Sequence, residues 1–480
     1  MLGHLIRKEI LDHLLSPRFL ILSGVGALVI WLSLFSGYAC YQDRLKDYRL
    51  VQAMTEERIQ QMKNADQVVL DPYSTWQEIS TPHYLVHKPP TPMSIFIRGL
   101  EPHLGRSARG SWRGLLIKLS PAATEPILGL FPPLDLGRMV QFVLSLFVLL
   151  LTYDAVCGEK EGGTLRLVAS FPVSKDRLLF GKLFGALIPI LTAFGLPLLI
   201  GMGAVVLMPD VRLTGQELVR LGWILVALGI YLIAFTGIGL FVSSLVHRSA
   251  TAFVLLLAFW VVTMAVIPRL SLIAAEGFRP APSFQEYMAE RYRIGREEAD
   301  KNRELIKQWE DAHPAAWNTP EGREARHLYY AQVMDRAHEM YRPQMASLEE
   351  AFQNRYHART ALAGTLGRLS PAFALKNATI KLAGAGLDRH QRFEIAYNQH
   401  RERDRIWTQR AAILDFLKRG YPAKYGKHRW DTSEMPRFVY QETWPEEEVQ
   451  AALVDIGLLA LWGVVSFLGA YVAMLKYDPR

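Results

Sequence analysis

The chain has 480 residues, of which 50% are hydrophobic and 21% charged, and its formal net charge is +8. Lys and Arg are spread along the chain and are not gathered into one basic patch, which excludes the electrostatic signature of a nucleic-acid-binding protein. The apolar residues are concentrated in runs too long for the core helices of a soluble protein. The composition therefore indicates a membrane protein.

The first expected element is an amphipathic helix in residues 1–18. Leu2, Ile6, Ile10 and Leu14 recur at steps of four, charged residues occupy the other face, and a proline follows. This pattern is typical of a helix that lies in the membrane surface. We expect an elbow helix here, with an ordinary cytoplasmic helical turn as the alternative.

Six apolar runs are long enough to cross a bilayer, which requires roughly 20 helical residues. Five of these runs contain no charged residue in their central part, and the remaining one has charges only near its ends, where side chains can reach the interface. The sequence therefore predicts an all-α membrane protein with six transmembrane helices. The expected spans are residues 19–40, 136–157, 182–209, 221–246, 249–268 and 451–475.

Lys and Arg in the short connections predict the orientation of these spans. Eleven of them lie in the N-terminal segment, the loop at 154–182, the turn at 247–248 and the C-terminal tail, against two in the loop at 210–220. Short cytoplasmic loops carry the excess of positive residues. Both termini and the loop at 154–182 are therefore expected to face the cytoplasm.

Two long segments, 41–135 and 269–448, are then left on the outer side. Amphipathic, charge-rich patterns at 42–64, 284–311 and 322–359 predict long helices in both of them. Neither segment has enough apolar residues for a large core of its own. We expect the two to pack together as one mainly helical extracytoplasmic domain.

Two stretches of this outer domain should depart from regular helix. Pro343 lies within the last amphipathic pattern and should kink or break the helix, because proline removes a backbone donor. The proline-rich stretch HYLVHKPPTPMSIFIRG, residues 83–99, predicts two short extended runs around a turn. This would be a minor β element.

The sequence contains no complete catalytic motif. The stretch FGKLFG at 180–185 has glycine and lysine in sequence, but it lacks the Ser or Thr and the first glycine of a phosphate-binding loop. No arrangement of nucleophile and base is apparent elsewhere. We expect a chain that is not an enzyme, with no catalytic residue and no cofactor.

Two groups of side chains are potential ligands of a soft metal ion: His83 with His87, and Met334 with His338 and Met345. Imidazole and thioether ligands would suit Cu(I). Prolines directly after His87 and Lys88 disfavour the helix that would bring the two imidazoles together, and methionine stripes usually fill cores. No metal site is expected.

Asp455 lies near the outer end of the last expected span. An ionisable side chain at membrane depth is a functional candidate by default. The alternative is a structural ion pair with an arginine of the outer domain.

The loop at 158–181 carries more chemistry than a connector needs. Two acidic residues precede a Gly-Gly hinge, which permits a sharp backbone turn, and Thr164 can cap a short helix, LRLVAS. Such a helix would lie across the cytoplasmic mouth and present apolar side chains to a protein partner, or alternatively rest on lipid headgroups. Leu165, Leu167 and Val168 are the apolar side chains that this helix would present, and Glu159 and Glu161 are expected on the solvent-facing loop before it.

This loop resembles the cytoplasmic loop of ABC-2-type exporter permeases. The resemblance rests on GEKEGGTL at 158–165, followed by FPVSKDRLLFGK at 171–182, with the amphipathic N-terminal helix and the six spans in support. HKPPTPMSIF at 87–96, FPPLDL at 131–136 and LSPAFAL at 369–375 are similar to the branch with large outer insertions. Members of that branch are often labelled as linked to multicopper-enzyme maturation.

The resemblance implies a permease subunit in a bacterial cytoplasmic (inner) membrane. Its loop would form a coupling helix that docks on a separate ATP-binding subunit, in which ATP hydrolysis resides. The resemblance implies contact or shape-setting roles in this interface for Glu159, Glu161, Gly163, Thr164 and Leu165, and places Leu167 in the same interface. Two such subunits would assemble with two permeases, identical or paralogous, within membrane lipid. The alternative is a membrane-anchored assembly, mechanotransmission or signalling protein whose outer helical domain binds a partner without moving a substrate.

Overall fold

The computed structural model describes residues 2–64, 85–111, 114–118, 134–165, 174–419 and 436–477. Within them, six helical stretches are long and apolar enough to cross a membrane. The prediction of an all-α membrane protein with six transmembrane helices is confirmed. The stretches are Pro17–Glu57, Leu136–Glu161, Lys175–Val206, Gly215–Leu245, Ser249–Phe278 and Glu446–Lys476.

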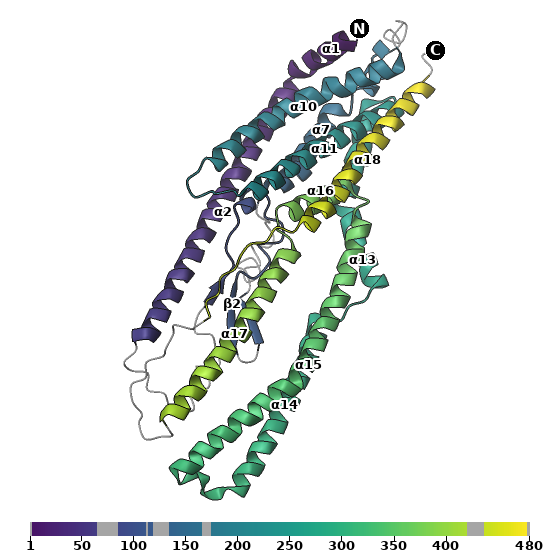
Figure 1. Cartoon of the computed structure of the whole chain (residues 1–480). Helices are drawn as coiled ribbons and strands as arrows, with labels where there is room; N and C mark the ends of the chain where they lie inside the picture. Colours follow the sequence, from purple (N-terminus) through teal and green to yellow (C-terminus); the bar gives the residue numbers. More distant parts are fainter. Residues whose placement is uncertain are drawn as a thin grey trace.

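The span helices run alongside one another at one end of the molecule, and both termini lie at the end of this bundle that points away from the inserted segments (Figure 1). Helix α11 (Gly215–Leu245) is its centre, packed against α18 (Glu446–Lys476) and α10 (Lys175–Val206). The N-terminal helix α1 (Leu2–Leu14) is the expected amphipathic element and packs along α10.

The second and fifth spans are each assembled from several helical pieces. Each contains a π-helical turn, a feature that is often found at functional positions. The pieces are α6 (Leu136–Arg138), a π-turn (Met139–Leu144), α7 (Ser145–Thr152) and α8 (Cys157–Glu161) in the second span, and α12 (Ser249–Val261), a π-turn (Val262–Val266) and α13 (Ile267–Phe278) in the fifth.

Helix α2 (Pro17–Asn64) combines the first span with the first predicted outer helix in 48 continuous residues. At 1.5 Å per residue it is about 70 Å long, more than twice the thickness of the hydrocarbon core. Its apolar half therefore belongs to the bundle, and its charged half extends beyond it beside the inserted segments.

A helical hairpin projects away from the bundle (Figure 1). It consists of α14 (Phe284–Ala312) and α15 (Pro320–Gly367), joined through a 3₁₀ turn (Pro314–Trp317). Both helices were expected from their amphipathic patterns. Of the kink or break expected at Pro343, the break is wrong, because α15 continues through this residue, and packing along α14 compensates for one missing backbone hydrogen bond.

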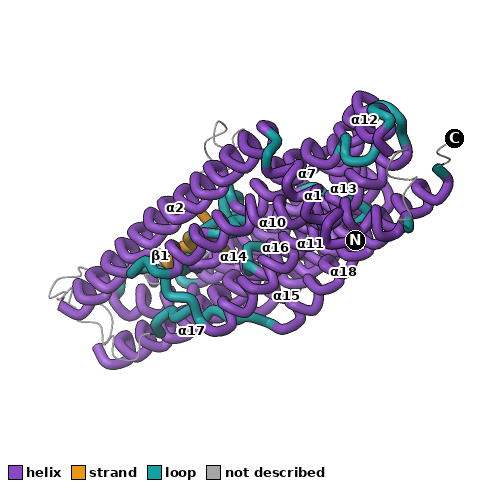
Figure 2. Tube along the Cα trace, turned by 90° about the horizontal axis from the view of Figure 1, so that it is seen from above, coloured by secondary structure: helices purple, strands orange, loops and turns teal. Residues whose placement is uncertain are grey.

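The minor β element is a three-stranded antiparallel sheet, small and set among helices (Figure 2). Strand β1 (Leu85–His87) pairs with β2 (Ser107–Ser111), which pairs with β3 (Gly114–Lys118). Only the first of the two extended runs expected at 83–99 is a strand. The second is a buried 3₁₀ turn, Pro92–Ile95, in which proline sets the backbone angle at the start.

The two inserted segments contact each other and form one body. Helix α16 (Pro371–Leu382), whose N-cap is Ser370, packs against α11 and α18 and joins this body to the bundle. Helix α17 (Leu387–Arg419) follows, and its aromatic side chains pack against Val86 of β1. The backbone N–H of Leu100 also donates to the carbonyl of Ala385 at 2.9 Å.

Candidate functional site

The loop end of the bundle is the end formed by α1, α8, the turn at 247–248 and the C-terminus of α18. The sequence predicts a loop directly after the second span, but in the structure Cys157–Glu161 form the short helix α8. The hydroxyl of Ser243 accepts hydrogen bonds from the N–H groups of Val156 and Cys157, both at 3.0 Å. The start of α8 is therefore fixed to α11.

Lys160 makes a second connection between α8 and α11. Its ammonium group donates to the carbonyl oxygens of Ser244 and Val246, which end α11. The same group lies 5.2 Å from the ring centre of Tyr477, just after α18. A cation at a helix C-terminus is favoured by the helix dipole, so Lys160 stabilises the junction of three elements.

Glu159 does not face solvent as expected from the sequence. Its carboxylate lies 2.8 Å from Nζ of Lys182, and the Lys182 side chain is only 2% exposed. Glu9 of α1 lies 3.2 Å from the same ammonium group, and Lys8 lies 4.0 Å from Glu159. We call Lys182, Glu9, Glu159 and Lys8 the loop-end charge cluster; it joins α1, α8 and α10.

Two glycines of α10 let α1 approach closely enough for this cluster to form. A Cβ atom at Gly185 would lie 2.3 Å from Cβ of Glu9, and one at Gly181 would lie 3.2 Å from Cβ of Leu5. The stretch FGKLFG is thus a small-xxx-small packing motif. The spacing of the two glycines could have revealed it, and Lys182 between them was missed as the centre of a charge cluster.

Glu161 is exposed, as expected, but it also has a local partner. Its carboxylate accepts hydrogen bonds from the backbone N–H and the hydroxyl of Ser249, at 3.0 and 2.9 Å, and so stabilises the N-terminus of α12. Gly163 has a φ of +71°, a conformation that favours glycine, in agreement with the expected hinge. Thr164 beside it is exposed.

The expectation that the Leu165 side chain is presented to a partner is wrong, because this side chain is buried. It is 1% exposed and packs in a cluster with Val156, Leu179, Leu240 and other apolar residues at the base of the bundle. Burial of the side chain removes it from any surface open to a partner. Leu167 lies outside the described residues, together with most of the helix that Thr164 was expected to cap.

On the described part of the loop end, the end of α8 and the adjoining turn at 247–248 share one exposed surface. Residues 162–164 of this surface have small side chains, so their backbone is accessible, and the turn contributes two basic residues. The surface consists of Glu161, Gly162, Gly163 and Thr164, with His247 and Arg248 of the neighbouring turn. We call it the loop-end patch.

Asp455 lies at the opposite end of α18 and is fully buried. It has the arginine partner expected as the alternative to a transport role: Nε of Arg368 lies 2.6 Å from its carboxylate. Lys381 at 3.3 Å and the amide of Asn377 at 2.7 Å complete its contacts. These bonds join α18 to α15 and α16.

Among the residues that the structure describes, there is no group of three or more His, Cys, Asp or Glu side chains placed to hold a metal ion. His83 of the weighed histidine pair lies outside these residues. His87 is described, and burial, together with the charge of Arg106, lowers the pKa of its imidazole below the usual 6.5.

Comparisons with known proteins agree with this architecture. A family model described as ABC-2 family transporter protein matches residues 4–312, and one described as a domain of unknown function (DUF3526) matches residues 284–452. The two matches overlap over residues 284–312, which are the whole of α14, the first helix of the hairpin.

Two curated relatives are each named probable ABC transporter permease protein NosY. The chain is 38% identical over 106 residues to the protein from Stutzerimonas stutzeri, covering 22% of this chain and 36% of that relative. It is 45% identical over 51 residues to the protein from Pseudomonas aeruginosa, covering 11% of this chain and 18% of that relative. The alignments thus span only about a third or less of the relatives, whereas the first family model matches more than half of this chain. The chain belongs to the ABC-2 family of transporter proteins.

Proposed function

We propose that the chain is the transmembrane subunit of an exporter in a bacterial inner membrane, driven by a separate ATP-binding subunit that docks on the loop-end patch. In this proposal both termini and the patch face the cytoplasm, and the inserted body lies on the outer side. The excess of Lys and Arg in the short loops of that end supports this orientation.

The loop-end charge cluster is the observation that carries the proposal. Lys182 is almost fully buried, so separating it from Glu159 or Glu9 would leave a charge in a poorly solvated position. Helices α1, α8 and α10 therefore move together when α8 moves. A force applied at the patch is transmitted directly to the elbow helix and to the third span.

The patch itself suits docking by backbone and polar contacts. Gly162, Gly163 and Thr164 expose the chain without bulky side chains, and Glu161 and Arg248 offer charges of both signs. Two permeases, identical or paralogous, and two ATP-binding subunits would form the complete transporter. Each permease would present one such patch.

The test is a bulky substitution that blocks the patch without removing packing. Thr164→Trp should lower the affinity for the cognate ATP-binding subunit by about tenfold or more, which corresponds to about 1.4 kcal/mol. The measurement is co-purification with that subunit, together with the ATPase activity of the complex. The melting temperature of the permease alone should not change, because Thr164 is exposed.

Thr360→Trp is the matched control. Thr360 is also exposed and helical, and its hydroxyl also bonds to a backbone carbonyl, but it lies on α15 in the projecting hairpin. It should leave binding and ATPase activity unchanged. Full binding by Thr164→Trp, or an equal loss in the control, would contradict docking on the patch.

The projecting hairpin supports a second candidate, a protein that transmits force to an outer partner and moves no substrate. Helices α14 and α15 extend far from the bundle and end in an exposed turn (Figure 1). Vesicles that contain the complete complex and are loaded with cell extract distinguish the two functions. ATP-dependent loss of a small molecule, detected by mass spectrometry, supports export, and ATP hydrolysis with unchanged contents supports force transmission.

A further inference from the structure

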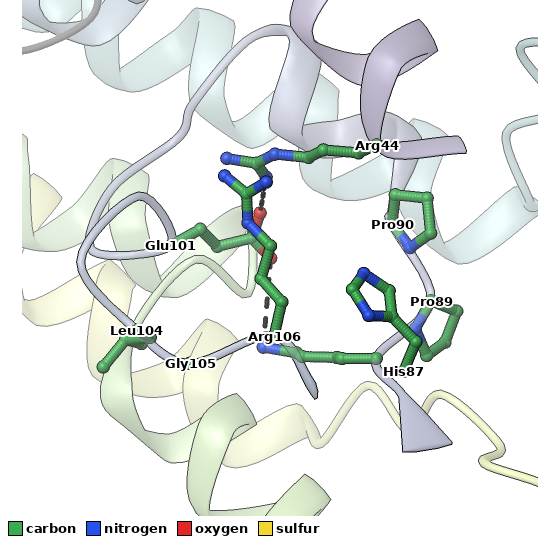
Figure 3. A pocket seen from close by; sticks show the side chains of 9 residues that line it. Arg44, His87, Pro89, Pro90, Glu101, Leu104, Gly105 and Arg106 are labelled. Atoms are coloured by element: carbon green, nitrogen blue, oxygen red, sulfur yellow. Dashed lines mark hydrogen bonds and ion pairs between the residues drawn. The ribbon is translucent and has the colours of Figure 1, made fainter. Parts of the chain in front are cut away.

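A small basic pocket lies in the inserted body, where the charged half of α2 meets the stretch that links β1 to β2. Its volume is about 20 Å³, which is room for a single small group. Figure 3 shows the guanidinium groups of Arg44 and Arg106 pointing toward one another at the Glu101 carboxylate. His87, Lys88 and four uncharged residues complete the lining.

The permanent charges around this pocket do not balance. Glu101 is 8% exposed and is the single carboxylate of the lining, but it contacts Arg44 and, at 3.9 Å, Lys88, and it also bonds to Arg389 behind the pocket. Arg389 has a second carboxylate partner, Glu442, at 2.7 Å. Four basic side chains, Arg44, Lys88, Arg106 and Arg389, thus share only two acidic side chains, Glu101 and Glu442.

Several donors in the pocket are left without a partner. Nε and Nη2 of Arg44 and Nε of Arg106 are buried and have no hydrogen-bond partner among the residues that the structure describes. The side chain of Arg44 is only 7% exposed. Buried donors of a charged group are normally paired, so these nitrogens indicate room for an acceptor from outside the described chain.

The electrostatics of the neighbours agree with a missing negative charge. Burial, and next the charge of Arg389, lowers the pKa of Lys88 to about 8 from 10.5. Burial, and next the charge of Arg44, lowers the pKa of Arg106. Asp47 also acts on Arg106, but it is exposed, so solvent screens its charge.

We propose that this pocket binds one oxyanion group, a phosphate or a carboxylate, between Arg44 and Arg106. Guanidinium groups bind such groups through two parallel N–H bonds, and the unpaired nitrogens supply these donors. The same chemistry is offered by a free anion and by the phosphate of a lipid headgroup. Arg44 follows the first span closely along α2, which places the pocket near the membrane boundary.

Thermal unfolding of the full-length chain in neutral detergent tests the site, with inorganic phosphate as the probe at constant ionic strength. The melting temperature of the wild type should rise with phosphate concentration and then saturate, because a ligand that binds only the folded state stabilises it. Arg106→Gln should melt no lower than the wild type without phosphate, because the repulsion with Arg44 is relieved. Its phosphate-dependent rise should be lost.

Arg303→Gln is the matched control, since Arg303 is 78% exposed on α14 and distant in sequence from the pocket. It should show the full phosphate-dependent rise. Arg106→Lys keeps the positive charge but loses the two parallel N–H donors of the guanidinium group, so its apparent affinity for phosphate should fall about tenfold. This variant replaces Arg106→Gln in the test if Arg106→Gln does not fold. No rise in the wild type, or an unchanged rise in both Arg106 variants, overturns the proposal.

Nanodiscs distinguish the two sources of the oxyanion. If the lipid headgroup is the ligand, phosphatidylglycerol discs raise the melting temperature above that in phosphatidylcholine discs, and free phosphate adds little. If a free anion is the ligand, phosphate raises the melting temperature equally in both lipids. Either result supports the site only when Arg106→Gln abolishes the rise, and an equal rise in that variant overturns it.

Discussion

The protein has one buried charge cluster at the loop end of its bundle and another in the inserted body, and the two are built in opposite ways. At the loop end, one buried base, Lys182, is surrounded by the acids Glu9 and Glu159. In the inserted body, one buried acid, Glu101, is surrounded by basic side chains. Both clusters join segments far apart in sequence: the first lies between three packed helices, and the second lies where α2, the stretch between β1 and β2, and α17 meet.

The atoms left unpaired show what this difference means. In the loop-end cluster only one carboxylate oxygen, Oε2 of Glu159, is buried without a partner among the described residues. Around Glu101 the unpaired atoms among the described residues include guanidinium nitrogens of Arg44 and Arg106 and Nδ1 of His87. The first cluster is nearly complete and holds helices together, and the second has spare donors for a ligand.

The largest effect is expected when the acid of the inserted body is removed. Glu101→Gln leaves three basic groups without their shared carboxylate, and loss of one partner from a buried ion pair costs about 3–5 kcal/mol. Chemical denaturation of the purified chain measures this loss. Glu56→Gln, which removes an exposed ion-pair partner of Arg437, should change stability by less than about 1 kcal/mol.

The same carboxylate predicts a pH dependence. Burial opposes ionisation of Glu101, but the charges of Arg389, Arg44 and Lys88 outweigh it and lower its pKa to about 2 from 4.5. Because the folded-state pKa is the lower one, the contribution of Glu101 is complete above pH 4.5 and is lost as the pH falls toward 2. Acid unfolding curves of wild type and Glu101→Gln should therefore converge between pH 4.5 and 2. Parallel curves would argue against a stabilising contribution of the ionised Glu101 carboxylate.

A smaller and more local effect is expected at the loop end. Lys182→Met leaves Glu9 and Glu159 partly accessible to water, so the expected cost is about 1–3 kcal/mol, the usual loss for a hydrogen-bonded charged group. Hydrogen exchange should accelerate in α1 and α8, while the exchange of α17 stays unchanged. The control is Lys46→Met, because Lys46 is 74% exposed.

This variant also bears on coupling. If the loop-end charge cluster transmits force, the complex with Lys182→Met should bind the ATP-binding subunit but hydrolyse ATP without responding to the permease. Loss of binding together with loss of protection throughout the bundle would show a general structural role and break the contrast between the two clusters.

The smallest effect is expected from the glycine contact beneath the loop-end charge cluster. Gly185→Ala places a methyl group 2.3 Å from Cβ of Glu9, so α1 must shift, at a cost of about 1 kcal/mol. Hydrogen exchange of α1 reports the shift. Gly195→Ala on the same helix has no atom within 4 Å of its new methyl group and should be neutral or slightly stabilising; equal effects of the two would refute close packing of α1.

Local patterns in the sequence were sufficient for the long helices of this protein, although not for the short helix α8 or the 3₁₀ turn at Pro92–Ile95. The six spans, the helix before them and the helices of the hairpin follow from the length and periodicity of apolar residues, which depend on neighbours within a few turns. The left-handed backbone at Gly163 likewise follows from the Gly-Gly pair. An arginine partner for Asp455 was expected because an isolated charge at that depth is costly.

Only the tertiary structure decided which charged and apolar side chains meet. Glu159 and Leu165 read as surface residues of a loop, but Lys182 and the base of α10, α11 and α18 cover them. Arg44 and Arg106 are separated by a long stretch of chain and converge because α2 runs beside the sheet. Helical periodicity indicates which face of an element is apolar, but the packing of distant segments determines which buried charges find a partner and which stay free for a ligand.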